Sequence, residues 1–476
     1  MLINTKYRYK DYFESIAHLR IKGMGVGTYY WKDITRYCDY FSHEDLSVLE
    51  IGCGTGELLH GIKGKRKVGI DFSPSMIKYA REQFPDIEFH EMSAEKPDLS
   101  EKFDLIILSN LIGFIEDVQH VFHELHKVCH PKTKIIITYY NYLWEPVIKF
   151  SEWIGIKTKT PPQNWLSQLD INNLLYLAGF DVYRTTKRML CPVYIPLISN
   201  VFNKYIAKIP IIRFFGLNTF SFAKTLPIEN KEAFKEKHSV SIVIPARNES
   251  GNIEEAVLRM PVFGKSIEII FIEGRSEDDT WQKIQETSEK YKDKYQIKIA
   301  QQDGAGKGDA VRKGFDMASG DILMILDADL TVPPEDLPKF YEAIASGMGE
   351  FINGSRLVYP MEKQAMRLLN ILGNKFFSMV FSWLLDQSFK DTLCGTKVIF
   401  HKDYKRLKAN RSFFGDFDPF GDFDLIFGAH KLNLKITELP IRYRERKYGT
   451  TNISRFRHGL LLLKMCFFAA RKIKFY

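Results

Sequence analysis

Apolar, β-rich runs alternate with helical patterns along the whole chain, and this alternation constrains the fold more than any other feature. Nine runs are typical of buried strands, namely residues 46–52, 66–71, 87–92, 103–110, 133–140, 240–246, 267–274, 295–302 and 321–329. Strands that alternate with helices build layered α/β structures, in which helices cover a largely parallel sheet. The sequence therefore predicts an α/β protein.

The length of the chain predicts two domains. Its 476 residues exceed what one hydrophobic core holds, because single cores stop growing near about 250–300 residues. A charged stretch at residues 226–238, with Pro227 near its start, separates the first five strands from the last four. We expect a linker there, between a first domain of residues 1–230 and a second of residues 238–476.

The positive charge is concentrated at the C-terminal end. The formal net charge is +9, and residues 440–476 hold ten Lys and Arg against one acid, Glu445. Such an end can bind nucleic acid, an anionic lipid or a phosphorylated substrate. The last 19 residues read as an apolar helix with lysines around it, which either lies on a membrane face or packs on its own domain.

Cysteine usage and the first residues bear on location. The six cysteines include no C-x-x-C pair, which indicates a reducing compartment without a disulfide frame or a zinc site. Residues 2–20 carry charges throughout and lack the apolar core of a signal peptide. We expect a cytoplasmic protein with a peripheral contact at the inner face of the membrane, made by the basic C-terminal segment.

The strongest local motif is "VLEIGCGTGELL", residues 48–59. A strand carrying Glu50 runs into Gly52, Gly54 and Gly56, which open a helix. Glycines at alternate positions let the backbone turn tightly and approach a ligand closely. Fifteen residues later a second strand ends in Asp71, where a carboxylate can accept hydrogen bonds from a ribose diol. The G-x-G-x-G spacing differs from the dinucleotide fingerprint, and no P-loop sequence is present.

Together these features resemble the class I S-adenosylmethionine (SAM) methyltransferases, over residues 45–145. The resemblance implies a Rossmann-like fold that binds SAM as its cofactor. It implies that the glycines line the methionine part of SAM, that Asp71 takes the ribose hydroxyls, and that Asn110 faces the acceptor. The implied cofactor-binding residues are Glu50, Gly52, Gly54, Gly56, Asp71, Met92, Ser93, Ala94 and Asn110, of which Met92 to Ala94 hold the adenine.

The sequence hides the methyl acceptor. Methyl transfer from a sulfonium is an in-line displacement in which the enzyme supplies proximity and alignment, so no particular base is required. Tyr29, Tyr30 and Trp31 precede the glycine motif. They either close over the acceptor or belong to the core.

Four ordered loops mark the second domain. "VSIVIPARNESGNIEEAV" is followed by "IIFIEGRSEDDTW", by "GAGKGDAVRKGFDMASGD" and by "ILMILDADLTVPPEDL". The last places Asp327 and Asp329 directly after an apolar strand, so that two carboxylates enter one crevice. Hard oxygen ligands of this kind suit Mg²⁺ or Mn²⁺ bridging a diphosphate.

This series resembles the family 2 glycosyltransferases of the GT-A fold, and within them the dolichyl-phosphate mannose synthase-like group, over residues 239–456. The resemblance implies a nucleotide-sugar donor and an inverting, metal-dependent transfer in which Asp327 and Asp329 are catalytic and hold the metal. Gly274 replaces an Asp of the usual pattern, which leaves the base and sugar of the donor open. The implied substrate-binding residues are Pro245, Ala246, Arg247, Asn248, Glu249, Glu273, Asp278, Lys307, Arg356 and Arg446.

An acid for the acceptor side has two candidates, Asp422 and Asp424, in a segment rich in Asp and Phe. Each is either a catalytic base or a structural residue at a helix N-terminus. A lipid-phosphate acceptor needs no base, because its oxygen is already anionic. The apolar segment 366–389 lies where the lipid-phosphate members rest on the bilayer, and here it contacts a membrane, fills a domain interface or completes the core.

We therefore expect a bifunctional transferase that moves a methyl group from SAM and a sugar from a nucleotide sugar to a glycan or a polyprenyl or other lipid phosphate. Two alternatives stay open: one domain is a non-catalytic ligand-binding module, or the methyltransferase acts on nucleic acid. A nucleic-acid partner is disfavoured, because the basic tail belongs to the second domain and no aromatic stacking motif accompanies it.

Overall fold

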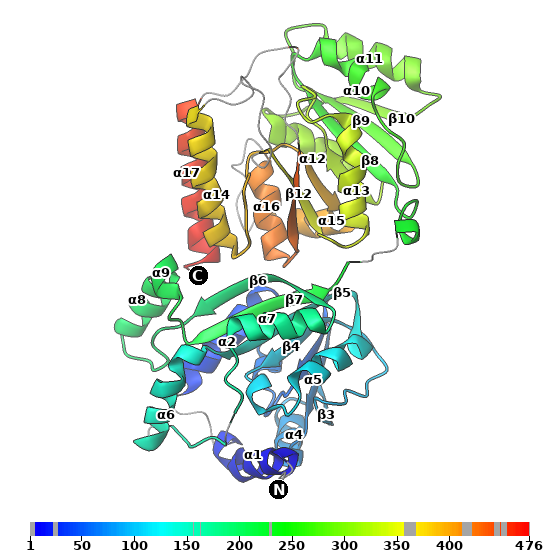
Figure 1. Cartoon of the computed structure of the whole chain (residues 1–476). Helices are drawn as coiled ribbons and strands as arrows, with labels where there is room; N and C mark the ends of the chain where they lie inside the picture. Colours follow the sequence, from blue (N-terminus) through cyan, green and yellow to red (C-terminus); the bar gives the residue numbers. More distant parts are fainter. Residues whose placement is uncertain are drawn as a thin grey trace. The chain divides into compact units, whose positions relative to one another are not determined.

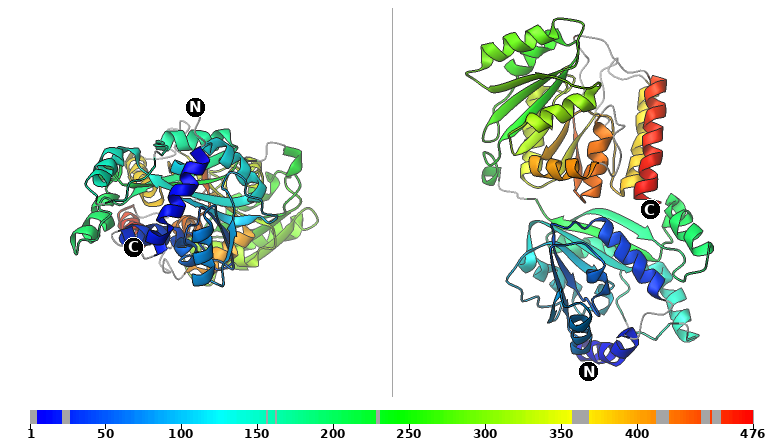
Figure 2. Two further views of the ribbon diagram at one scale, coloured as in Figure 1. Left: turned by 90° about the horizontal axis from the view of Figure 1, so that it is seen from below. Right: turned by 180° about the vertical axis from the view of Figure 1, so that it is seen from behind.

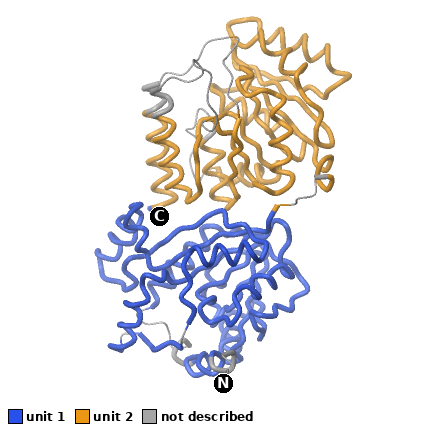
Figure 3. The backbone as a smooth tube through the Cα atoms, in the orientation of Figure 1, with its two compact units in different colours: residues 1–226, 475 blue, residues 227–474, 476 orange. Residues whose placement is uncertain are grey.

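The chain folds into two compact α/β units, which confirms the predicted fold class. The computed structural model describes residues 5–21, 27–155, 157–161, 163–227, 231–356, 368–411, 421–441, 448 and 455–475. Unit 1 extends to Leu226, and unit 2 runs from Pro227 to Lys474 (Figure 3). Each unit is built on a seven-stranded mixed sheet with helices against it (Figure 1).

The sheet of unit 1 has the strand order β3-β2-β1-β4-β5-β7-β6. Its strands are β1 Ser47–Ile51, β2 Arg66–Asp71, β3 Glu88–Glu91, β4 Phe103–Ser109, β5 Cys129–Tyr140, β6 Phe180–Arg188 and β7 Asn218–Thr225. The first five are parallel, and β7 runs antiparallel to both of its neighbours, β5 and β6. β6 therefore runs parallel to β5, so that its C-terminal end reaches the same sheet edge as those of β1 and β4.

Helices cover both faces of this sheet. They are α1 Thr5–Ile21, α2 Thr28–Tyr40, α3 Glu57–His60, α4 Pro74–Gln83, α5 Val118–Glu124, α6 Glu145–Trp153, α7 Gln168–Leu177, α8 Ile198–Lys204 and α9 Pro210–Arg213. Local signals set several starts. The Ser73 side chain accepts a hydrogen bond from the Met76 N–H, and Pro74 fills the first position of α4. Ser167 and Asp170 form a capping box at α7.

The sheet of unit 2 has the order β10-β9-β8-β11-β13-β12-β14, with β13 antiparallel to its two neighbours. Its strands are β8 Val240–Ala246, β9 Ile267–Glu273, β10 Gln296–Gln301, β11 Ile322–Ile325, β12 Phe351–Ser355, β13 Lys397–Phe400 and β14 Ile436–Pro440. β8, β9, β10 and β11 are parallel. The loops that follow them therefore gather at one edge of the sheet.

The helices of unit 2 are α10 Ile253–Leu258, α11 Thr280–Tyr291, α12 Lys307–Met317, α13 Leu337–Ala345, α14 Leu368–Leu385, α15 His401–Ala409, α16 Asp422–Lys431 and α17 Arg455–Ile473. α14 and α17 lie side by side (Figures 1 and 2). One face of α14 completes the core, because the Phe381 ring packs on Phe423 and Phe427 of α16 at 4.6 and 5.1 Å between centroids. Within the described part of the chain, no helix is long and apolar enough to cross a bilayer.

Candidate active sites

The glycine loop after β1 adopts backbone conformations that favour glycine. Gly52, Gly54 and Gly56 have φ angles of +74°, +54° and +87°. A Cβ atom on Gly52 would lie 2.8 Å from the Leu111 side chain. The Gly52 N–H donates to the Ile70 carbonyl at 2.8 Å, which ties the loop to β2. The loop thus turns sharply at the carboxyl edge of the sheet, where its backbone can approach a ligand.

Asp71, at the end of β2, holds this loop. Its Oδ2 accepts a hydrogen bond from the Gly54 N–H at 2.9 Å, and its Oδ1 accepts one from the Ser73 N–H at 2.9 Å. The carboxylate is buried and lines the same hollow as the glycines. Its orientation is therefore fixed before any ligand binds.

Glu50 is a buried acid with an unsatisfied oxygen. Its side chain is 3% exposed, and its Oε2 atom has no hydrogen-bond partner among the described residues. Burial, together with the nearby charges of Glu57 and Asp71, raises the pKa of Glu50 well above its usual value. A buried polar atom without a partner costs free energy. A cationic group in the hollow would satisfy this oxygen, so the site fits the amino group of SAM.

Two adjoining hollows share Phe72, Leu111 and Phe114 as walls. The structure brings eight of the nine predicted cofactor residues to these walls. The first hollow is lined by Glu50, Gly52, Gly54, Asp71 and Asn110, and the second by Met92, Ser93 and Ala94. Gly56 lies in the loop behind them, where a Cβ would meet the Phe89 ring at 2.8 Å.

The sequence reading missed the aromatic walls. Phe13 of α1 contacts Phe72 and Phe114 edge to face, with ring centroids 5.8 and 5.1 Å apart. Phe72 directly follows Asp71, which is a signal that the sequence offers. Phe13 and Phe114 come from distant segments and meet only in the fold.

Asn110, which the resemblance predicts to face the methyl acceptor, lines the first hollow together with Trp31. The Asn110 Nδ2 donates to the Tyr30 hydroxyl at 2.8 Å, and its Oδ1 is buried without a partner among the described residues. Tyr30 is buried, and Trp31 lines the hollow. Of the two roles left open for these aromatic residues, Tyr30 therefore belongs to the core, whereas Trp31 lines the hollow.

In unit 2, the loop after β8 is tied to the loop after β9. Asn248, with φ of +56°, donates its N–H to the Ser276 Oγ at 3.0 Å, and its Oδ1 accepts from the Glu277 N–H at 2.8 Å. The Ser250 N–H donates to Asp278 at 3.3 Å. Partial burial opposes ionisation of Asp278, but hydrogen bonds from Thr280 and Ser250 hold its pKa below the usual value.

The remaining residues of these two loops lie beside them at the sheet edge. Buried Glu273 accepts hydrogen bonds from the Ser276 N–H and from the Gln301 Nε2, the latter at 3.1 Å. The Gly274 N–H donates to the Ala246 carbonyl at 2.8 Å. A Cβ on Gly274 would lie 3.1 Å from that of Arg247. The predicted residues Pro245 to Glu249, Glu273 and Asp278 thus come together at one edge.

The D-x-D pair follows β11. The Asp327 carboxylate pairs with the Lys307 ammonium at 2.6 Å, and Asp329 accepts hydrogen bonds from the Thr331 N–H and hydroxyl at 3.1 and 2.8 Å. Burial opposes the charge of Asp327, but Lys307, with Lys397 and Arg356 farther away, holds its pKa below the usual value. Lys307 therefore lies at the D-x-D motif.

Gly395, which the sequence reading missed, packs against this pair. A Cβ atom on Gly395 would overlap the Asp327 carboxylate and the Lys307 ammonium. The loop that carries it, between α14 and β13, therefore forms part of the wall of the site. The sequence gives a glycine there but no spacing that relates it to Asp327.

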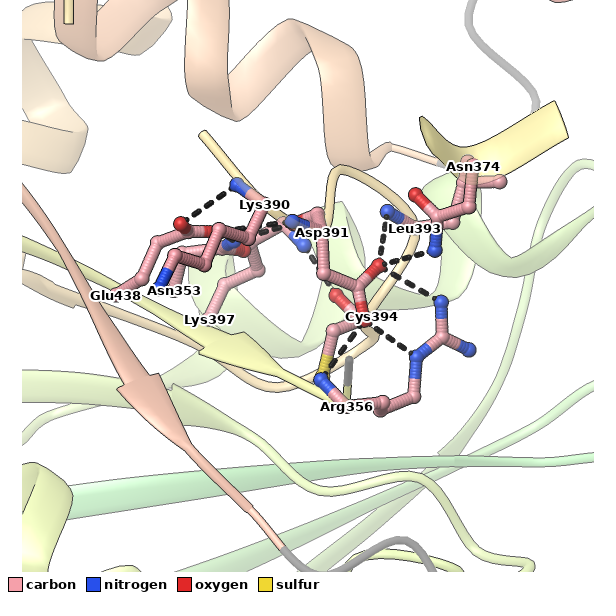
Figure 4. A network of polar contacts seen from close by, with 9 residues as sticks. All are labelled: Asn353, Arg356, Asn374, Lys390, Asp391, Leu393, Cys394, Lys397 and Glu438. Carbon is pink, nitrogen blue, oxygen red and sulfur yellow. Dashed lines mark hydrogen bonds and ion pairs between the residues drawn. The ribbon is translucent and has the colours of Figure 1, made fainter. Parts of the chain in front are cut away.

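Arg356 is held by Asp391, a buried acid that the sequence reading also missed (Figure 4). The Arg356 Nε and Nη2 donate to the two Asp391 oxygens at 2.7 and 2.8 Å. Asn374 of α14 donates to the same carboxylate at 2.8 Å. Burial opposes ionisation, but the Arg356 charge and these hydrogen bonds lower the pKa of Asp391 to about 2. Arg356, one of the predicted substrate-binding residues, thus has a fixed orientation.

The same network fixes the loop after α14. The carboxylate of Glu438 in β14 accepts hydrogen bonds from the Lys390 and Asp391 N–H groups at 2.7 and 3.0 Å (Figure 4). Burial raises the pKa of Glu438. The loop that carries Asp391 and Gly395 is therefore anchored at Lys390 and Asp391, through backbone N–H groups to Glu438 of β14 and through the Asp391 carboxylate to Arg356.

Of the three remaining predicted residues, the structure describes one side chain. The buried Asp424 carboxylate accepts a hydrogen bond from the Arg411 Nε at 2.9 Å. Asp422 is the first residue of α16, but its side chain lies outside the described residues, as does the whole of Arg446. In the described part of the chain, no group of three or more His, Cys, Asp or Glu gathers at a metal-binding distance.

Both sites have the arrangement typical of group-transferring enzymes, which bind the molecule that donates the group at the carboxyl ends of the strands of an α/β sheet. Residues 42–177 match the family model described as a methyltransferase domain, and residues 241–407 match that of glycosyl transferase family 2. The chain therefore joins a methyltransferase domain to a family 2 glycosyltransferase domain.

Relatives of unit 2 include polyprenyl-phosphate sugar transferases. The chain is 42% identical over 121 residues to the dolichol-phosphate mannosyltransferase of Pyrococcus furiosus, covering 25% of this chain and 33% of that protein. It is 28% identical over 141 residues to the undecaprenyl-phosphate 4-deoxy-4-formamido-L-arabinose transferase of Enterobacter sp. (strain 638), covering 28% and 43%. The chain thus spans less than half the length of either relative.

Among solved structures, the chain is similar to a SAM-dependent methyltransferase of Thermotoga maritima. The sequence identity is 16% and the TM-score 0.37, over 45% of this chain and 99% of that one. The match of residues 42–177 to the methyltransferase family model assigns unit 1 to the methyltransferases.

Proposed function

We propose that the protein is a bifunctional transferase, in which unit 1 moves a methyl group from SAM and unit 2 moves a sugar from a nucleotide sugar to a polyprenyl phosphate. The observation that carries this proposal is that each transferase family model falls on a separate unit, and each unit gathers its own predicted residues at one sheet edge. The lipid-phosphate acceptor is supported by two relatives of unit 2, a dolichol-phosphate mannosyltransferase and an undecaprenyl-phosphate sugar transferase.

In unit 1, the residues present fit SAM. When bound, SAM supplies an electrophilic methyl group on its sulfonium sulfur. Glu50 would pair with the amino group of its methionine part, Asp71 with the ribose hydroxyls, and Met92 to Ala94 with the adenine. Asn110 and Trp31 would border the methyl acceptor. The protein contributes alignment, because an in-line methyl displacement depends mainly on proximity.

In unit 2, Asp327 and Asp329 would hold Mg²⁺ or Mn²⁺, and the diphosphate of the donor would complete its ligands. When bound, the metal neutralises the charge that develops on the nucleoside diphosphate. Residues 245–249, with Glu273 and Asp278, would bind the nucleoside, and Lys307, Arg356 and Arg446 the phosphates. Asp422 or Asp424 would serve as base only for a glycan acceptor, because a lipid phosphate is already anionic.

The polyprenyl acceptor places the sugar transfer at a membrane. We infer a cytoplasmic protein that contacts the inner face through its basic C-terminal segment, because polyprenyl phosphates are membrane lipids and that segment carries positive charge. The two alternatives, a silent binding module and a nucleic-acid methyltransferase, are not favoured by a chain that joins two transferase domains.

A transfer assay with the full chain tests this function. Radiolabelled GDP-, UDP- or dTDP-sugars are incubated with Mn²⁺ and polyprenyl phosphate, and the label is extracted into organic solvent. We expect one of the donors to transfer label to the lipid phase. The rate of this transfer should fall by about a hundredfold in Asp329→Asn, since a carboxylate ligand of the metal is removed. Lys283→Gln, at an exposed site on α11, is the matched control. Label that stays in the aqueous phase with every donor would reject the lipid acceptor.

A further inference from the structure

Unit 1 carries an apolar insertion between β6 and β7. Residues 189–217 join these two antiparallel strands and contain α8, a short 3-10 helix at Ile206–Lys208, and α9. Twelve large apolar side chains of this insertion are exposed, and Leu197 and Ile211 are each 80% exposed. So many exposed large apolar side chains within one short segment indicate an interaction surface, because water-soluble surfaces rarely keep large apolar patches.

α6 extends the apolar surface. The Trp144 Nε1 donates to the Phe215 carbonyl at 2.7 Å, and the Asn141 Nδ2 donates to the Phe214 carbonyl at 3.0 Å, so the start of α6 is fastened to the end of α9. α6 exposes Phe150 and Trp153, the latter to 75%. α6, α8 and α9 lie along the same side of unit 1 in both figures that show them (Figures 1 and 2).

The charge of the insertion has one sign. Residues 189–217 contain no Asp or Glu. Of their three basic residues, Lys204 is exposed and Arg213 is half-buried, so these two can face a membrane, whereas Lys208 is buried near Asp33. The two acids of α6 are each paired with a lysine, Glu145 with Lys149 and Glu152 with Lys157. Helices that combine exposed apolar side chains with basic residues bind at the interface of anionic bilayers, where the apolar groups enter the acyl boundary and the cations meet phosphates.

The β6–β7 insertion begins and ends at the sheet edge where the glycine loop and Asp71 line the first hollow. Asn218, the first residue of β7, pairs with Tyr140 at the end of β5 and with Arg188 at the end of β6. The Tyr29 hydroxyl of α2 accepts a hydrogen bond from the Asn203 Nδ2 of α8 at 3.3 Å. Two residues from Tyr29, Trp31 lines the hollow. One helix thus connects the insertion to the acceptor end of the site.

We propose that the β6–β7 insertion and α6 dock unit 1 on an anionic membrane surface, and that its methyl acceptor is carried by a membrane lipid. The class of acceptor rests on the proposed methyltransferase function, whereas the docking does not. Membrane contact then involves unit 1 itself, in addition to the basic segment at the C-terminal end of the chain.

Vesicle binding of the full chain tests the docking. Co-sedimentation with phosphatidylcholine vesicles, with and without phosphatidylglycerol, is compared for the wild type and for Leu197→Glu combined with Ile211→Glu. We expect binding to the anionic vesicles that falls by about tenfold or more in the double variant, because two charges would enter the acyl boundary. Leu169→Glu, at an equally exposed position of α7 (79%), is the matched control and keeps wild-type binding.

A second readout locates the contact. In a Cys191→Ser background, an environment-sensitive fluorophore is attached to Leu197→Cys or to Leu169→Cys. With anionic vesicles, the emission of the fluorophore at position 197 should shift to shorter wavelength, and that of the fluorophore at position 169 should not. Stabilisation by S-adenosylhomocysteine reports separately on the cofactor site and on the fold of the variants. The docking would be overturned by a wild type that does not bind vesicles, or by a double variant that binds them as well as the wild type. It would also be overturned by a fluorophore at position 197 whose emission does not shift, or by a double variant whose only change is dissociation of a dimer. Docking without any response to S-adenosylhomocysteine would reject the methyltransferase function instead.

Discussion

At the scale of the residue, Glu50 carries the strongest indication of a ligand. It is a buried acid whose Oε2 has no partner among the described residues, and burial raises its pKa. A protein keeps such a group when a ligand satisfies it, since buried unpaired carboxylates otherwise cost stability. The positively charged amino group of bound SAM should therefore favour the ionised form of Glu50.

We expect SAM binding to depend on pH through Glu50. The pKa of Glu50 is raised in the folded protein without ligand, and a bound cation lowers it. Below that raised pKa, SAM binding should therefore release a proton from Glu50. SAM should accordingly bind more weakly as the pH falls. Glu50→Gln should weaken binding by about tenfold, or 1.4 kcal/mol, and remove this pH dependence. Glu82→Gln, at an exposed site of α4, is the control. Titration calorimetry in two buffers of different ionisation enthalpy measures both effects, and equal proton release by wild type and Glu50→Gln would contradict this role.

At the scale of the element, the two sites depend on loops that follow strands. The glycine loop after β1 and the D-x-D after β11 could be predicted from the sequence, because strand, turn and functional residue are adjacent in the chain. Asp391 and Gly395 could not be predicted, because their roles arise only when the loop after α14 meets Arg356 and Asp327. The exposure of the β6–β7 insertion could not be predicted either, because its apolar sequence, broken by prolines, is typical of a cap on the first domain but does not show which side chains are covered.

The loop after α14 provides a test confined to unit 2. Gly395→Ala should lower sugar transfer by about a hundredfold, because its Cβ would displace the Asp327–Lys307 pair from the donor diphosphate. Gly373→Ala, where nothing lies within 4 Å of the added atom, should leave it unchanged. Methyl transfer or SAM binding by both variants should match wild type. Full sugar transfer by Gly395→Ala would show that this loop does not shape the site.

At the scale of the whole molecule, the two sheets have separate cores and separate sites. The core of unit 1 gathers around residues such as Ile51, Ile106 and Leu108, and that of unit 2 around Ile242, Phe271 and Met324. Two cores with their own ligands should unfold as two transitions, each stabilised by its own donor. A chain with one functional unit would respond to one donor alone.

Scanning calorimetry of the full chain tests that central claim most directly. The protein is heated alone, with S-adenosylhomocysteine, and with GDP-, UDP- and dTDP-sugars in the presence and absence of Mn²⁺. A ligand at a hundred times its dissociation constant stabilises its unit by about 2.7 kcal/mol. We predict that S-adenosylhomocysteine raises one transition and that one sugar nucleotide with Mn²⁺ raises the other. A chain whose unfolding is unchanged by every sugar nucleotide, or by S-adenosylhomocysteine, would contradict the account of two active transferase sites.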